Sequence, residues 1–188
     1  MKKIMFNDKY CLTQAVLDGT KTMTRRLLKE GTPLGNWEET AKCLPYKVGD
    51  IVAIAQPYKD IIECMAEYSD IIINVDGSIN REYKAGWTNK MFVRANLMPH
   101  HIRITDVKVE LLQDISEQDC LCEGIRYYPS SDKRWSNDSG YGYHIPKKGL
   151  HLFDTPYKAF ANLFERISGK GTWESNPWVV AYSFELVD

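Results

Sequence analysis

Three segments of the chain carry apolar residues at the spacing of an amphipathic helix. The first follows Asn7 or Asp8, which can cap a helix, and ends at Gly19. The second begins at the capping-box-like run 116–119 and ends at Gly124. The third begins at Asp154-Thr-Pro156 and gathers its apolar side chains on one side: Tyr157, Phe160, Leu163, Phe164 and Ile167.

Alternating or short apolar runs predict strands between these helices. The clearest are residues 51–55 after a tight turn at 46–50, residues 101–111 with a shift of register near Asp106, and residues 178–187. Weaker candidates are Ile71 to Val75, closed by an Asp76-Gly77 hairpin signal, and Met91 to Arg94. Strands spread along the chain with about three helices indicate an α+β fold, mostly antiparallel, rather than a doubly wound parallel sheet.

Two segments, 57–90 and 126–153, fit this pattern less well. The second is predicted to be a loop rich in tyrosine and basic residues, including Arg126, Tyr127, Tyr128 and Trp135. Aromatic and cationic side chains together suit stacking on bases and contact with phosphates. An aromatic surface loop that packs on the body of the protein is an equal alternative. Because the loop follows Glu123 directly, it is positioned to cover a pocket there.

Composition places limits on the function. The 188 residues are 44% hydrophobic and 26% charged, which fits one globular domain. A net charge of −1 argues against coating nucleic acid through bulk charge, although a local basic groove stays possible. Five cysteines form neither a disulfide framework nor a zinc pattern, so we expect a reducing cytoplasm. We expect no signal peptide, membrane span, metal or cofactor.

The segment Gly19-Thr-Lys-Thr-Met-Thr-Arg-Arg26 is the strongest candidate for a site. It collects hydroxyls, an amine and two guanidinium groups directly after a helix, a mixture that no packing requirement explains. The simpler interpretation is a solvated basic patch, since cations suit the C-terminal end of a helix.

This segment resembles the signature of the ASCH family, G-x-K-x-x-T-x-R, at Gly19, Lys21, Thr24 and Arg26. Three further runs are similar to the family in order and spacing: Tyr46 to Ile51, Asp114 to Ile125, and Phe164 to Val179, the last typical of a phage-associated subgroup. The subgroup has an Arg-Glu pair where this chain has Ala55-Gln56.

The resemblance implies a PUA-like fold, a compact and mostly antiparallel β pseudo-barrel. Residues 1–188 then form a single ASCH/PUA-like domain with insertions at about 57–90 and 126–153. It also implies a nucleic-acid-related function with RNA or a nucleoside as partner. The alternatives are a non-catalytic RNA-binding module and a phage accessory protein that binds another protein. The oligomeric state is open.

Small bacterial members of the family use a Lys, Thr and Glu set to hydrolyse the amide of acylated cytidines such as N4-acetylcytidine. The resemblance places that set on Lys21, Thr24 and Glu123. Thr24 would be the nucleophile, Lys21 its base when burial lowers the pKa of the amine, and Glu123 the proton shuttle. Thr22, Arg25, Arg26, Tyr127 and Trp135 are the candidates for binding nucleic acid or substrate.

One geometric requirement follows. On a regular strand Thr22, Thr24 and Arg26 share a face, whereas Lys21 points to the other side. We therefore predict irregular backbone over residues 19–22 and a strand that begins near Met23.

Overall fold

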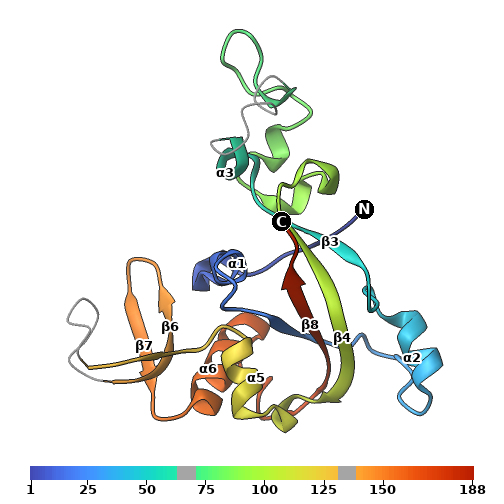
Figure 1. The fold of residues 1–188 in the computed structure, drawn as a ribbon, viewed down its shortest axis with the longest axis vertical. Helices are drawn as coiled ribbons and strands as arrows, with labels where there is room; N and C mark the ends of the chain where they lie inside the picture. The colour runs from blue at the N-terminus through green and yellow to red at the C-terminus, as the bar shows by residue number, and fades with distance from the viewer. Residues whose placement is uncertain (63–70, 131–138) are drawn as a thin grey trace. The chain divides into compact units, whose positions relative to one another are not determined.

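The computed structural model describes residues 1–62, 71–130 and 139–188, and Figure 1 shows the fold. The chain divides into two compact units. The first consists of Met1–Phe6, Ile51–Arg103 and Leu186–Asp188, and the second of Asn7–Asp50 and Ile104–Glu185. Each unit is described by itself below.

The strands form two sheets. The larger has the order β1-β3-β4-β8-β2, with β1 Lys2–Ile4, β2 Met23–Leu27, β3 Ile51–Ile54, β4 His101–Leu111 and β8 Trp178–Leu186. The smaller has the order β5-β6-β7, with β5 Arg126–Tyr128, β6 Gly140–Ile145 and β7 Gly149–Phe153. Strand β1 is parallel to β3, whereas the pairs β3–β4, β2–β8, β5–β6 and β6–β7 are antiparallel. The α+β class and the mostly antiparallel pairing are thus confirmed. Among the described strands, β1 and β2 are edges of an open sheet, and no barrel closes.

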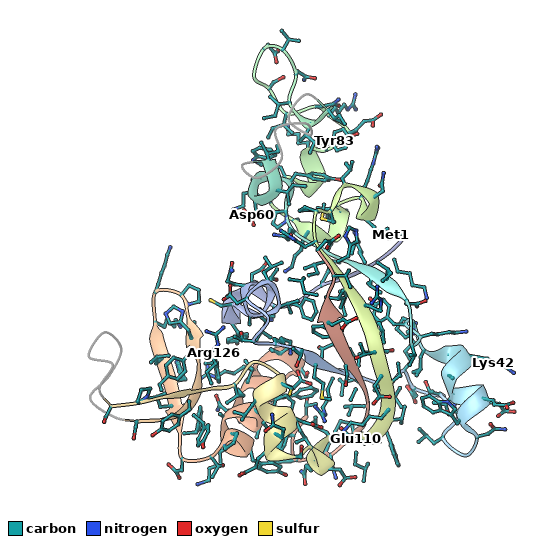
Figure 2. The ribbon with its side chains drawn as sticks, in the orientation of Figure 1. Met1, Lys42, Asp60, Tyr83, Glu110 and Arg126 are labelled. Atoms are coloured by element: carbon teal, nitrogen blue, oxygen red, sulfur yellow. The ribbon has the colours of Figure 1, made fainter. Side chains whose placement is uncertain are left out.

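The first unit has its own core around helix α3 (Tyr58–Ile62). Tyr58 packs edge-on against Tyr83 with ring centroids 5.4 Å apart, and its hydroxyl accepts a hydrogen bond from the Arg94 backbone amide. Figure 2 shows the side chains of this core near the label of Tyr83. The other buried members are Ala53, Ala55, Ile61, Ile72, Val93, Leu97 and Met98.

Two weaker strand predictions fall in this unit. Across the Asp76-Gly77 turn only Ile73 and Ile79 pair, as an isolated antiparallel bridge, so the turn is right but the strand is not. The predicted strand at Met91 to Arg94 is wrong, because Lys90–Phe92 forms a 3-10 turn. The side chain of Asn89 accepts a hydrogen bond from the Met91 amide and so favours the turn over an extended strand.

The second unit contains α1 (Leu12–Leu17), α2 (Trp37–Cys43), α5 (Glu117–Cys122) and α6 (Pro156–Ser168). Helix α6 buries Phe160, Leu163 and Phe164, and Figure 1 shows it beside α5 and the smaller sheet. Ile167 belongs to the predicted stripe but stays 41% exposed in the last turn.

The three predicted helices are confirmed, and so are the caps of the second and third, whereas Asn7 caps a 3-10 turn and α1 has no side-chain cap. Ser116 accepts from the Asp119 amide, and Thr155 accepts from the Lys158 amide with Pro156 in the first turn. Helix α1 begins later than predicted because Cys11 adopts a left-handed conformation (φ 55°) after a 3-10 turn at Asp8–Tyr10. Helices α2 and α3 were not predicted.

The prediction that residues 126–153 form a loop is wrong for the part that the structure describes. Strands β5, β6 and β7 fill most of it, with Tyr127 opposite Tyr141 and Tyr143 opposite His151. Whether one domain carries two insertions stays a prediction. None of the helices in the described ranges combines the length and the apolar composition needed to cross a membrane.

Candidate functional site

The backbone between α1 and β2 is irregular, as the sequence predicted. Gly19 has a φ of 69°, and the amides of Thr20 and Lys21 both donate to the Ala15 carbonyl, at 2.9 and 2.8 Å. The Thr22 amide then donates to the Cys122 carbonyl at 2.9 Å, and β2 begins at Met23. The segment that carries the signature is therefore attached to the C-terminal end of α5.

Lys21 and Glu123 form a buried ion pair across 102 positions of sequence. The Lys21 Nζ lies 2.6 Å from Oε2 of Glu123 and donates to the Glu123 carbonyl oxygen at 2.8 Å. Their side chains are 2% and 6% exposed. Burial lowers the pKa of Lys21; the Glu123 carboxylate opposes this shift, and the charges of Arg26 and Arg25 add to it.

Gly124 allows this close approach. It has a φ of 99°, a conformation that residues with a side chain rarely adopt, and a Cβ there would lie 3.5 Å from the Lys21 Cβ. The aliphatic part of Lys21 therefore packs directly on the glycine that ends α5.

Arg25 binds three carboxylates from two elements. Its guanidinium lies 2.7 Å from Glu110 on β4, 2.6 Å from Asp119 on α5 and 3.2 Å from Glu123. Lys108 adds contacts at 2.9 Å to Asp119 and 3.2 Å to Glu110. Figure 2 labels Glu110 at this side of β4. The Arg25 side chain is 0% exposed, so it holds these carboxylates in place instead of facing solvent.

Thr24 lies on the other face of β2, because neighbouring residues of a strand alternate. It pairs with Tyr182 of β8 in the antiparallel ladder, so the two side chains share a face. Within the described ranges the Thr24 hydroxyl makes no hydrogen bond, and the buried Tyr182 hydroxyl faces the Tyr46 backbone without a well-formed hydrogen bond. The Tyr46 ring meets the Tyr182 ring edge-on, at 5.3 Å between centroids.

The hydroxyls of Tyr182 and Tyr46 lie within the field of Arg26. Burial raises the pKa of Tyr182 to about 12, and the Tyr46 backbone and, less strongly, the Arg26 cation oppose this shift. Burial likewise raises the pKa of Tyr46, again against Arg26.

The structure thus brings together Lys21 and Glu123, with Arg25 beside them. It gives Thr24 no hydrogen bond to either residue. Thr22 and Arg26 are exposed, and Tyr127 on β5 is 55% exposed with its ring 5.1 Å from that of Tyr141. Trp135 lies outside the described residues.

Sequence reasoning missed Glu110, Asp119, Tyr46 and Tyr182. The sequence held a signal for the first two. Lys108 and Glu110 are two positions apart and so share one face of β4, and Asp119 lies in the first turn of α5. Nothing in the sequence distinguishes Tyr182 from other strand tyrosines. Over residues 1–62, 71–130 and 139–188, no three His, Cys, Asp or Glu side chains are grouped so that they could hold a metal ion.

No protein-family model and no curated protein matches the chain. Solved structures that are similar to it include the following two. An ASCH domain from Lactobacillus crispatus JV V101 has 15% identity and a TM-score of 0.40, over 96% of this chain and 75% of that one. A protein from Enterococcus faecalis V583 of the family model DUF984 has 16% identity and a TM-score of 0.37, over 94% of this chain and 67% of that one. Scores at this level do not establish a shared fold, so the relation to ASCH domains still depends on the sequence motifs.

Proposed function

We propose that the protein is an ASCH-like, PUA-like domain that removes an acyl group from the exocyclic amine of a cytidine-type nucleobase. The buried Lys21–Glu123 pair carries the proposal, since its Nζ and Oε2 atoms are 2.6 Å apart. A lysine whose pKa is lowered by burial is suited to take a proton from a hydroxyl. The odd cysteine count supports a reducing, cytoplasmic setting.

In this mechanism Lys21 of the ion pair first passes a proton to Glu123, and the freed amine then takes the proton of the Thr24 hydroxyl while the threonine oxygen bonds to the amide carbonyl carbon. The bond from that carbon to the nucleobase nitrogen then breaks. The proton passes by way of Lys21 and Glu123 to the departing nitrogen, which leaves as the free exocyclic amine. Water cleaves the threonyl ester, releases the carboxylic acid and restores Thr24.

The remaining residues have supporting roles. Arg25 holds the Glu123 side chain in place through its 3.2 Å contact, so we assign it a positioning role rather than contact with substrate. Arg26 and the Tyr182 hydroxyl are on the Thr24 face and are suited to hold the substrate.

Turnover of N4-acetylcytidine, followed by chromatographic separation of cytidine, tests this proposal. We expect Thr24→Ala and Lys21→Met each to lower kcat by a factor on the order of 10³, as for other nucleophile–base pairs. Thr105→Ala is the matched control, because Thr105 is an exposed threonine of β4 outside the proposed site, and it should keep wild-type kcat.

Each result decides a separate part of the proposal. Absence of turnover by the folded wild type would exclude deacylation of this substrate. Wild-type turnover by Thr24→Ala together with an inactive Lys21→Met would show that water, not Thr24, is the nucleophile. If both variants turned over normally, the ion pair would be only structural.

RNA binding without catalysis is the second candidate, and the exposure of Arg26 favours it. It predicts RNA affinity that falls with salt and is weakened by Arg26→Gln. Because Arg25 is enclosed by carboxylates, it would contribute no phosphate contact, so its conservative variant Arg25→Lys should leave the salt dependence unchanged. Failure of the wild type to bind RNA at low salt would exclude this candidate.

A further inference from the structure

The second unit contains a pocket of about 350 Å³ that has no role in the function proposed above. It lies between α1 and the sheet β5-β6-β7, and we call it the α1–β6 pocket. Its lining consists of Tyr10, Cys11, Leu12, Gln14, Ala15, Asp18, Gly124, Arg126, Tyr128, Tyr143, His144 and Leu150. A mostly apolar hollow of this size with a few polar groups is typical of sites for small molecules.

The aromatic wall of the pocket is fixed in place by its own contacts. The Tyr143 ring stacks on His151 with an interplanar angle of 9° and meets Tyr10 edge-on, at 5.7 Å between centroids in both cases. The Tyr143 hydroxyl donates to Asn162 of α6 at 2.6 Å. The shape of this wall is therefore formed before any ligand arrives, which lowers the entropic cost of binding.

One cation, Arg126, stands at this pocket, and Figure 2 labels it between α1 and the smaller sheet. Its guanidinium contacts the Thr20 hydroxyl and lies 3.6 Å from the Asp18 carboxylate. Both side chains of this ion pair are more than 40% exposed, at 42% and 44%. Exposed pairs of this kind contribute little stability, so an incoming anion can redirect Arg126 at small cost.

Asp18 and Gln14 provide a polar edge near the cation. The Gln14 Nε2 donates to one Asp18 oxygen at 2.7 Å, which leaves the amide oxygen of Gln14 to accept a hydrogen bond, and the second Asp18 oxygen can accept one when Arg126 turns to an anion. Amino groups on a heteroaromatic ring are suitable donors to such acceptors. The pocket thus offers an apolar aromatic wall, an anion-binding guanidinium and acceptors for a ring amine.

We propose that the α1–β6 pocket binds a small molecule that joins a planar ring to a phosphate, with a nucleoside monophosphate as the representative ligand. The phosphate binds Arg126 in the bidentate manner that guanidinium favours, and the ring lies along the tyrosine wall. The site is separate from the proposed hydrolytic one, because Lys21, Thr24 and Glu123 do not line it. Ala15 and Gly124 line the pocket and also contact Lys21.

Cys11 provides a direct readout of occupancy. Its thiol lines the pocket 3.8 Å from Nδ1 of His144, and the residue is partly exposed. Alkylation by N-ethylmaleimide, measured by peptide mass spectrometry, therefore reports whether the pocket is filled. The exposed Cys43 in the same sample is the internal reference.

We expect CMP or AMP at ten times its Kd to slow alkylation of Cys11 about tenfold while Cys43 reacts unchanged. Cytidine, which lacks the phosphate, and inorganic phosphate, which lacks the ring, should each protect Cys11 less at the same concentration. Calorimetric titration should give Arg126→Gln a Kd for CMP that is about tenfold higher or more. Arg81→Gln, which removes an exposed arginine of the first unit, is the matched control and should bind as wild type.

The proposal is overturned if no nucleotide protects Cys11, or if inorganic phosphate alone protects it as well as CMP does. Normal CMP binding by Arg126→Gln would also overturn it. The comparison of CMP, cytidine and phosphate on the wild type decides the matter even if that variant does not fold. Lys21→Met should bind CMP normally, so failure of the deacylation proposal leaves this one testable.

Discussion

Glu123 is the residue on which the buried charges of the site converge. It accepts from Lys21 at 2.6 Å and from Arg25 at 3.2 Å, and its side chain is 6% exposed. The two cations are not equally dependent on it. The Arg25 guanidinium contacts two further carboxylates. Within the described residues, the Lys21 ammonium otherwise donates only to the Glu123 carbonyl oxygen.

This asymmetry predicts different stabilities for two variants. Glu123→Gln leaves a buried ammonium without a carboxylate and should lower the free energy of unfolding by about 3–5 kcal/mol. Lys21→Met leaves Glu123 paired with Arg25 and should cost less, about 1–3 kcal/mol. Urea denaturation measures both, with Lys59→Met as control, because Lys59 and Asp60 form a half-exposed pair at 3.8 Å. Equal losses for the two variants would contradict this account.

Asp119 makes the site sensitive to acid. Partial burial by itself would raise its pKa, but hydrogen bonds from Lys108 and Arg25 outweigh it and lower the pKa below 3.8. A carboxyl with a lowered pKa in the folded state stabilises the protein above its unfolded pKa and loses that effect as pH falls through the folded value.

We therefore expect Asp119→Asn to lower the free energy of unfolding by about 1 kcal/mol at pH 7, with the difference from wild type shrinking below about pH 4. Thermal unfolding between pH 7 and pH 3 measures it. Asp106→Asn changes an exposed carboxyl on β4 and should show no such dependence. A difference that grew on acidification would refute the assignment.

At the scale of elements, the sheet β5-β6-β7 depends on close backbone contact at Gly142. This glycine pairs with Arg126 on one side and Leu152 on the other, and a Cβ there would lie 1.9 Å from the His151 carbonyl oxygen. A side chain at this position must push the backbone of β7 aside.

Gly142→Ala should accordingly destabilise the protein by about 2–3 kcal/mol and, because Tyr143 and His144 follow directly, weaken CMP binding in the α1–β6 pocket. Gly35→Ala is the control, since nothing lies within 4 Å of its added Cβ and its φ is ordinary. Calorimetry of unfolding and of CMP titration measures both effects. A Gly142→Ala protein as stable as Gly35→Ala would show that β7 accommodates the methyl group.

Elements with local signals were predictable from the sequence. The caps at Ser116 and Thr155 and the turn before Ile51 involve residues within a few positions of one another. The smaller sheet was not predictable in this way, because its strands contain few β-branched residues and its glycines resemble those of a loop. The requirement for glycine at position 142 becomes apparent only when β7 lies beside it.

The residues of the candidate site can also be divided into those that were predicted and those that were missed. The pairing of Lys21 with Glu123 came from the family resemblance and not from spacing, since 102 positions separate them. The carboxylates around Arg25 were missed because two of them reach it from β4 and α5, which are distant in sequence. Long-range charge pairing of this kind leaves no periodic pattern in the sequence.

For the whole molecule, the two units differ in what they hold. The signature, the Lys21–Glu123 pair and the α1–β6 pocket all belong to the second, while the first has a separate aromatic core around Tyr58 and Tyr83. Substitutions that empty the first core should therefore be tested for effects on stability before any effect on turnover is interpreted.

The pairing of β2 has a consequence for the order of assembly during synthesis. In the sheet, β2 is an edge strand whose one described neighbour is β8, at residues 178–186. The signature emerges from the ribosome early, yet the strand beside it is translated more than 150 residues after Met23 to Leu27. A nascent chain therefore carries the strand of the signature without its neighbour, and this edge of the sheet is completed only when translation has passed β8.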